Sequence, residues 1–233
     1  EIASCLVGSE MCIRDSFKTS QPSPQEFLDI FEEVKKKQET LICLSLSSKL
    51  SGTYQSACLA KDMVDYENIY IVDTLTAAAG IRLLCEVAMN WIGENRSVEN
   101  IVSGLEGLKE RVHIYAGLDT LEYLAKGGRI SKTAAAIGTL ASIKPIICVE
   151  HGEVVVAGKT RGVNKATSVV CEKMQSDIVD TLYPVYTLYS YGLENVEKLE
   201  SKLDLDVNRV RIGSTIGVHI GPNAFGVCFV SKL

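Results

Sequence analysis

Two hydroxyl-rich loops contain the residues of this 233-residue chain that are best suited to bind a small anion. Thr19 and Ser20 lie in the first loop, and Ser48, Ser51 and Gly52 lie in the second. Each loop runs directly into a predicted helix, whose first turn presents unpaired backbone N–H groups and a partial positive charge. If the two helix starts meet in space, these groups would bind an anionic head group. The loops therefore predict a ligand site.

Six sequence blocks resemble, in the same order, the DegV family of bacterial fatty-acid-binding proteins. They are Thr-Ser-Gln-Pro-Ser at 19–23, Ser-Ser-Lys-Leu-Ser-Gly-Thr at 47–53, Leu-Glu-Tyr-Leu with Gly-Gly-Arg-Ile-Ser at 121–131, Ile-Lys-Pro-Ile at 143–146, Lys-Thr-Arg-Gly at 159–162 and His-Ile-Gly-Pro at 219–222. A single Ser-Gly-Thr would be unspecific. Six ordered blocks over residues 18–233 make the resemblance specific.

The resemblance implies a non-catalytic carrier without a cofactor, which binds a long-chain fatty acid such as palmitate. It also implies that the carrier presents the carboxylate to a separate fatty-acid kinase for phospholipid synthesis. Thr19 and Ser51 match the hydroxyls that hold the carboxylate, and His219 matches a histidine beside it. A carboxylate accepts several hydrogen bonds, which hydroxyls and helix-start N–H groups can donate. The predicted carboxylate site also includes Ser20, Ser48 and Gly52.

Three basic residues are candidates for contact with the head group or with the kinase. In the family, the arginine that Arg129 matches lies near the head group, and exposed basic residues help to dock the kinase. Gly127 and Gly128 predict a helix end that positions Arg129. Lys159 and Arg161 are expected in a polar loop between a strand and a helix, where a long cation can reach a partner.

An enzyme that acts on a phosphorylated or acylated small metabolite through the same loops is the alternative function. The nucleophile motif Gly-x-Ser-x-Gly is absent, because the segment around Ser51 lacks the first glycine. Neither a phosphate loop nor a dinucleotide fingerprint occurs. A purely structural interpretation also stays open, in which Ser51 only caps a helix, Thr19 is a turn residue and His219 ends a strand.

Composition excludes several other classes of protein. A net charge of -5 argues against a general nucleic-acid binder, whose surface would be basic. The eight cysteines include no Cys-x-x-Cys pair, so we expect small buried side chains in a reducing compartment rather than disulfides or a metal site. No apolar run approaches the ~20 residues of a membrane span. We therefore expect a cytoplasmic protein.

The order of apolar runs and helical patterns predicts an α/β fold with two α/β domains, residues 1–111 and 112–233. The first domain is expected to contain a mostly parallel, doubly wound sheet, which binds ligands at the carboxyl ends of its strands. The second is expected to contain a mixed sheet with helices. Strands are predicted at 40–46, 69–72, 112–118, 146–149, 154–156 and 185–191, and helices from Ser23 and Ser97 and over 52–64, 76–91, 163–176 and 193–203.

Residues 1–16 do not fit the resemblance. Family members open with a strand and an Asp-Ser loop followed by further strands, whereas here Asp15-Ser16 leads almost at once into the first hydroxyl loop. We expect 1–16 not to be native family sequence and the first domain to lack part of its sheet. A defective fold without function is therefore a third hypothesis.

A fatty-acid tail requires an apolar tunnel, because each buried methylene contributes ~0.8 kcal/mol. Apolar stripes at helical spacing are also typical of ordinary core packing, so the sequence does not separate tunnel from core. The candidate wall residues are Ile81, Leu84, Ala116, Leu121, Ile137 and Leu140.

Overall fold

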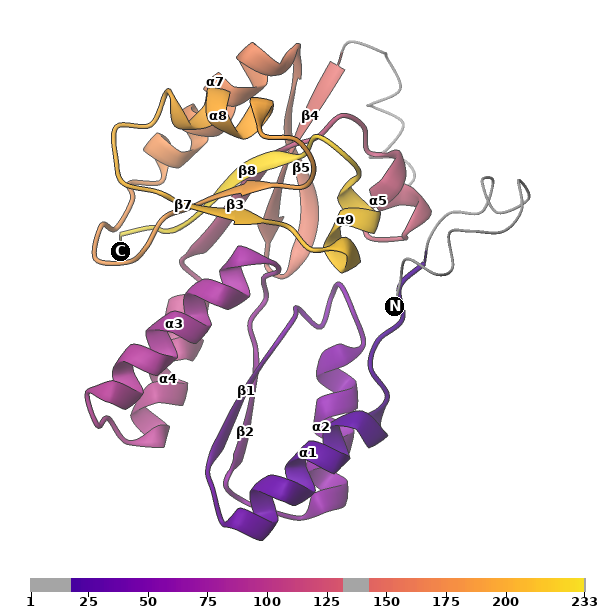
Figure 1. The fold of residues 1–233 in the computed structure, drawn as a ribbon, viewed down its shortest axis with the longest axis vertical. Coiled ribbons are helices and arrows are strands. Elements are labelled where there is room, and N and C mark those ends of the chain that lie inside the picture. Colours follow the sequence, from indigo (N-terminus) through magenta and orange to yellow (C-terminus); the bar gives the residue numbers. More distant parts are fainter. Residues whose placement is uncertain (1–17, 132–142, 233) are drawn as a thin grey trace.

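The computed structural model describes residues 18–131 and 143–232, and it contains two sheets (Figure 1). One is a parallel pair, β1 (Leu41–Ser45) and β2 (Ile69–Asp73). The other has six strands in the order β5-β4-β3-β8-β6-β7. The predicted α/β class is confirmed. The predictions for residues 1–16, Ile137 and Leu140 lie outside the described residues.

Helices cover both faces of the two-stranded sheet. Figure 1 shows α1 (Pro24–Lys37) and α2 (Thr53–Val64) on one side, and α3 (Ala79–Gly93) and α4 (Val98–Lys109) on the other. The side chains of β1 alternate accordingly, because successive residues of a strand point to opposite faces. Leu41 and Cys43 pack with α1 and α2. Ile42 and Leu44 pack with the core around α3.

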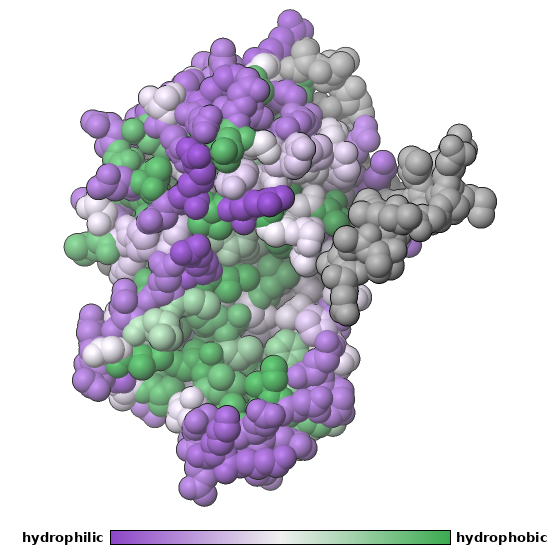
Figure 2. All heavy atoms as spheres, in the orientation of Figure 1, coloured by the Kyte–Doolittle hydropathy of each residue, from purple (hydrophilic) through white to green (hydrophobic). Residues whose placement is uncertain are grey.

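The outer edge of β1 lies between these two helix layers. Within residues 18–131 and 143–232, β1 pairs only with β2. Its residues Leu41–Leu44 are all half-buried, whereas Ile69 and Val72 of β2 are fully buried. Figure 2 shows apolar side chains gathered in the lower half of the molecule, between the helix layers.

The larger sheet is mixed, as predicted. It consists of β3 (Val112–Gly117), β4 (Ile143–Glu150), β5 (Glu153–Arg161), β6 (Tyr186–Tyr189), β7 (Asn208–Arg211) and β8 (Phe225–Val230). Only the β6–β7 pair is parallel among these strands. One face packs against α7 (Val163–Ser176) and α8 (Glu194–Glu200). The opposite face, called the inner face below, packs against α3, α5 (Glu122–Lys126) and α9 (Ser214–Ile220).

Local signals explain most of these elements. Ser23 caps α1 in a reciprocal capping box with Glu26, and Ser97 caps α4 through the N–H of Asn100. Strand β3 begins at Val112, directly after the domain boundary expected near Arg111, but one hydrophobic cluster contains residues from both sides of that point. The division into two domains stays a prediction.

Candidate functional site

One cavity brings together four of the residues predicted for the ligand site. Thr19, Ser51, Arg129 and His219 all line it, and its volume is about 140 Å³. The cavity lies between the inner face of the large sheet and the loops that follow β1 and β2. Thr19 and Ser51 therefore lie at one site, although α1 and β1 separate them in sequence.

Thr19 and His219 are in direct contact. The Thr19 Oγ1 and His219 Nε2 atoms are 2.6 Å apart, although 200 residues separate them. His219 lies in the last turn of α9, so the interpretation as a strand-end histidine is wrong. The stretch before it contains β-branched residues and glycines, which suit a strand pattern as well as a short helix.

Two glycines allow α9 to pack closely against α5. A Cβ on Gly127 would lie 2.2 Å from the His219 Nδ1 atom, so only glycine leaves space for the imidazole. Gly221 has a φ of +77°, and a Cβ there would lie 2.4 Å from the Tyr123 ring. These contacts position His219 at the polar end of the cavity.

The imidazole of His219 carries an unsatisfied polar atom. Its Nδ1 is buried and has no hydrogen-bond partner among the described residues. Burial lowers the pKa of His219, and the nearby positive charge of Arg129 lowers that pKa further. Both effects favour the neutral imidazole over the protonated form in the ligand-free protein. Leaving a buried nitrogen unpaired is costly, which is typical of a site that another group completes.

Ser51 lies immediately before α2 and faces the cavity. Its Oγ is 2.8 Å from the Thr53 Oγ1 and accepts a longer bond, 3.4 Å, from the Thr53 N–H. Gly52 occupies the capping position without a side-chain cap. A Cβ on Gly52 would lie 1.8 Å from the Gln21 Oε1, and the Gln21 Nε2 donates to the Ser56 Oγ at 3.1 Å. The first hydroxyl loop is thereby packed against the start of α2.

Arg129 connects the second hydroxyl loop to the end of α5. Its Nε donates to the Leu50 carbonyl at 3.0 Å, and its guanidinium also donates to the Gly127 carbonyl. Gly128 has a φ of +74° and turns the chain after the helix, as the paired glycines predicted. The guanidinium is thus held at the cavity by two backbone carbonyls.

Other predicted residues do not line the cavity. Ser20 is exposed, and the Ser48 N–H donates to the Asp73 carboxylate at 3.1 Å. Lys159 and Arg161 are exposed, but they belong to the edge strand β5 and not to a loop, so that prediction is wrong. The strand extends this far because its pairing with β4 continues up to Arg161, which lies opposite Ile143.

The remainder of the cavity is mostly apolar. Among the predicted wall residues, Ala116 lines it, Leu84 and Leu121 are fully buried in the core, and Ile81 is half-buried outside it. Sequence reasoning missed several residues that do line it, namely Ile114, Ile147, Val149, Val154 and Leu188 on strands, and Ile212 directly after β7. Alternation along the predicted strands was the available signal, since Ile114 and Ala116 share a face.

The described residues contain no group of three or more His, Cys, Asp or Glu side chains that could hold a metal ion. Within the same residues, no helix has the length and apolarity required to cross a membrane. The cysteines described here are unpaired, and burial raises the pKa of Cys43 to about 11 and that of Cys148 to about 12. These thiols are therefore protonated at neutral pH.

The family model described as "Uncharacterised protein, DegV family" matches residues 11–232. The chain belongs to the DegV family. A DegV domain-containing protein of Clostridium acetobutylicum is 35% identical over 217 residues, which are 92% of this chain and 78% of that protein. The match to the family model includes residues 11–16, part of the segment expected to be foreign to the family.

Solved structures of DegV proteins have the same fold. A protein of Thermus thermophilus, described for its fatty-acid binding, is 30% identical with a TM-score of 0.83, over 92% of this chain and 79% of that one. A stearic-acid-binding protein of Eubacterium ventriosum is 28% identical with a TM-score of 0.81, over 92% of this chain and 78% of that one. Members of the family therefore bind fatty acids.

Proposed function

We propose that this protein binds a long-chain fatty acid, with the carboxylate at the polar end of the cavity and the tail along its apolar lining. The observation that carries the proposal is the convergence of Thr19, Ser51, Arg129 and His219 on one cavity whose remaining walls are mostly apolar. Fatty-acid binding by the DegV protein of Thermus and by the stearic-acid-binding protein of Eubacterium supports it.

The polar end suits a carboxylate. Thr19 and Ser51 provide hydroxyl donors, and a neutral His219 provides one ring N–H, whose position depends on the tautomer. Arg129 supplies positive charge, so a carboxylate entering the site is not left buried without compensation. Hydrogen bonds to a charged acceptor are worth roughly 1.5–3 kcal/mol each.

We further propose that the carrier presents its carboxylate to a separate fatty-acid kinase, and that Lys159 and Arg161 contact this partner. Both side chains are exposed on β5, an edge strand, and neither lines the cavity. Exposed cations at an edge can steer an acidic partner without disturbing the ligand. Kinase docking and lipid uptake would then depend on different residues.

The contact between Thr19 and His219 bears on the enzymatic alternative. At 2.6 Å, the hydroxyl and the Nε2 have the spacing of a nucleophile and a general base. A catalytic triad also requires a third group that orients the imidazole through Nδ1. Among the described residues Nδ1 has no such partner, which favours a carrier over a hydrolase.

The test is lipid analysis of the purified protein, followed by titration of delipidated protein with palmitate. We expect a co-purifying acyl chain by mass spectrometry, and weaker titration binding for Thr19→Val. Thr40→Val, which removes an exposed hydroxyl before β1, is the matched control and should bind like the wild type. Protein that carries no lipid and takes none up would overturn the proposal.

A further inference from the structure

The register of the large sheet divides the inner face into rows of side chains. In antiparallel pairs, residues opposite one another point to the same face. One row contains Ala116 of β3, Gly226 of β8 and Leu188 of β6. The next row, further from the polar end, contains Ile114, Cys228 and Tyr186 on the same strands.

The cavity occupies the first row completely and the second row only in part. Ala116 and Leu188 line it, and Gly226 between them has no side chain. In the second row only Ile114 lines the cavity. Cys228 and Tyr186 are 0% and 1% exposed and belong to the solid core. The open space therefore stops at β8 and β6, where Gly226 and Leu188 of the first row are succeeded by Cys228 and Tyr186.

The cavity continues instead toward β4 and β5. Ile147 lies opposite Ala116, and Val149 follows it two residues later on the same face. Val149 in turn pairs with Val154 of β5. Since all three line the cavity, a tail that enters along the first row has space toward the β4–β5 hairpin.

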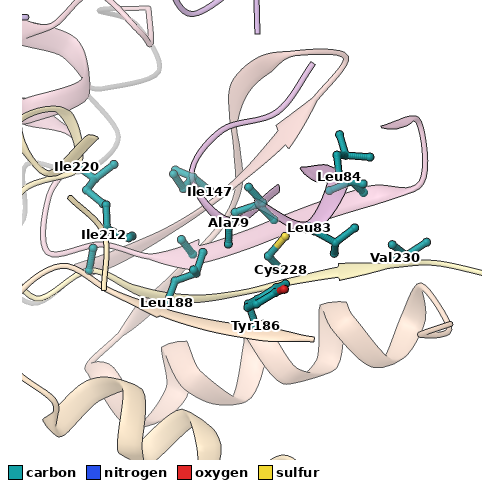
Figure 3. Packing of buried hydrophobic residues seen from close by; sticks show 14 of the residues in the cluster. Ala79, Leu83, Leu84, Ile147, Tyr186, Leu188, Ile212, Ile220, Cys228 and Val230 are labelled. Atoms are coloured by element: carbon teal, nitrogen blue, oxygen red, sulfur yellow. The ribbon is translucent and has the colours of Figure 1, made fainter. Parts of the chain in front are cut away.

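The side chains that close the direct path are held firmly. Figure 3 shows Cys228 between Leu83 of α3 and the ring of Tyr186. The Tyr186 hydroxyl donates to the Glu86 carboxylate, which forms an ion pair with Arg82 at 2.8 Å. The Arg82 guanidinium carbon also lies 5.4 Å from the centre of the Tyr186 ring. Rotation of the ring out of its place would break these contacts.

We propose that Tyr186, packed with Cys228 and Leu83, is the wall that limits the length of the acyl tail and turns it toward Val149 and Val154. This inference rests on the proposed function. It assigns chain-length selection to the ring of Tyr186, which lies two residues before the cavity-lining Leu188 on the same face of β6, where the open space ends. Tyr186 acts here as a specificity-determining residue, and the carboxylate contacts are unaffected by it.

The test is competitive loading of the delipidated full chain with an equimolar mixture of saturated fatty acids from lauric to arachidic acid. The bound acids are quantified by mass spectrometry after extraction. Tyr186→Leu should shift the bound mixture toward longer acids, because each additional buried methylene tightens binding about fourfold. Val149→Phe should shift it toward shorter acids, since the added ring fills the space toward β4 and β5.

Two further variants act as controls. Tyr186→Phe keeps the ring and should keep the wild-type mixture, which separates the volume of the ring from its hydroxyl. Phe229→Leu removes a ring that is as buried as that of Tyr186 but lies on the opposite face of the same sheet. This variant should also bind the wild-type mixture of acids.

The outcomes distinguish this inference from the function on which it rests. A folded Tyr186→Leu protein with the wild-type mixture would overturn the wall. If that variant does not fold, an unchanged mixture for Val149→Phe would overturn the turned path and the wall with it. Absence of any acid from the wild type would overturn the proposed function itself.

Discussion

The two ends of the cavity are built from different kinds of structure. At the polar end, Thr19, Ser51, Arg129 and His219 come from segments far apart in sequence and are held by a few hydrogen bonds. At the inner end, the lining residues lie on neighbouring strands whose register fixes their positions. Binding specificity for the head group therefore depends on single polar contacts, whereas the shape of the inner end depends on the core.

This difference predicts which substitutions affect stability and which affect binding. A residue of the inner end is part of the main hydrophobic cluster, so its loss destabilises the whole fold. A residue of the polar end contributes a contact to the ligand and little to the core. Five predictions follow from this separation, from the largest expected effect to the smallest.

Leu83→Ala should give the largest loss of stability. The side chain is 0% exposed in the main cluster, and truncation of such a leucine costs roughly 2–5 kcal/mol through the cavity that remains. Leu59→Ala, at a leucine of α2 that is 54% exposed, should change the free energy of unfolding by less than ~0.5 kcal/mol. Chemical denaturation of both variants measures the difference. Similar losses would mean that α3 does not anchor the core.

Ser51→Ala should weaken fatty-acid binding more than it weakens the fold. The lost hydrogen bond to a charged acceptor is worth roughly 1.5–3 kcal/mol, and Gly52 rather than Ser51 precedes α2, so a loss of stability above ~1 kcal/mol is not expected. Lipid titration and chemical denaturation give the two values. Equal losses would show that Ser51 acts only as a helix-start residue.

Lowering the pH should destabilise the ligand-free protein through His219. Its pKa is lowered in the folded state by burial and by Arg129, so the unfolded chain takes up the proton first. Stability is therefore unaffected above the unfolded pKa of ~6.5 and falls as the pH drops below it. Denaturation curves at several pH values should show a smaller decrease for His219→Gln, because His113, whose pKa burial also lowers, remains.

A bound carboxylate should weaken this pH dependence. A negative charge beside the imidazole favours its protonated form, so lipid-loaded protein should lose less stability on acidification than ligand-free protein. An identical pH dependence with and without fatty acid would place the carboxylate away from His219.

Arg161→Glu should leave lipid uptake unchanged and slow phosphorylation by the partner kinase, more so at low salt. Arg161 is exposed and does not line the cavity, and attraction between exposed charges is screened by salt. Measurements of bound acyl chain and of kinase turnover separate the two effects. Loss of lipid with normal kinase association would instead assign Arg161 to the ligand site.

Elements with strong local signals could be predicted from sequence, and those decided by distant contacts could not. Helix α7 has the predicted bounds, Val163–Ser176, and α1 begins at its capping box. The seven residues of α9 lack such signals, and their helix is packed against α5 through Gly127 and Gly221. The polar cavity residues were found through their resemblance to a family. The strand residues of the inner end could not be predicted in this way. Alternation shows which residues of a strand share a face, but the order of the strands in the sheet is needed to show which of them lie side by side.

The outer edge of β1 makes this half of the molecule a template for other strands. No strand of the described chain pairs with that edge. Charged residues and proline protect exposed edges in other proteins, and Leu41–Ser45 contains neither. An extended apolar peptide could pair there with backbone donors and acceptors that no described strand uses, between two helix layers. Self-association should therefore rise with protein concentration. It would extend the small sheet at an edge whose residues do not line the cavity, which lies beyond the carboxyl ends of β1 and β2.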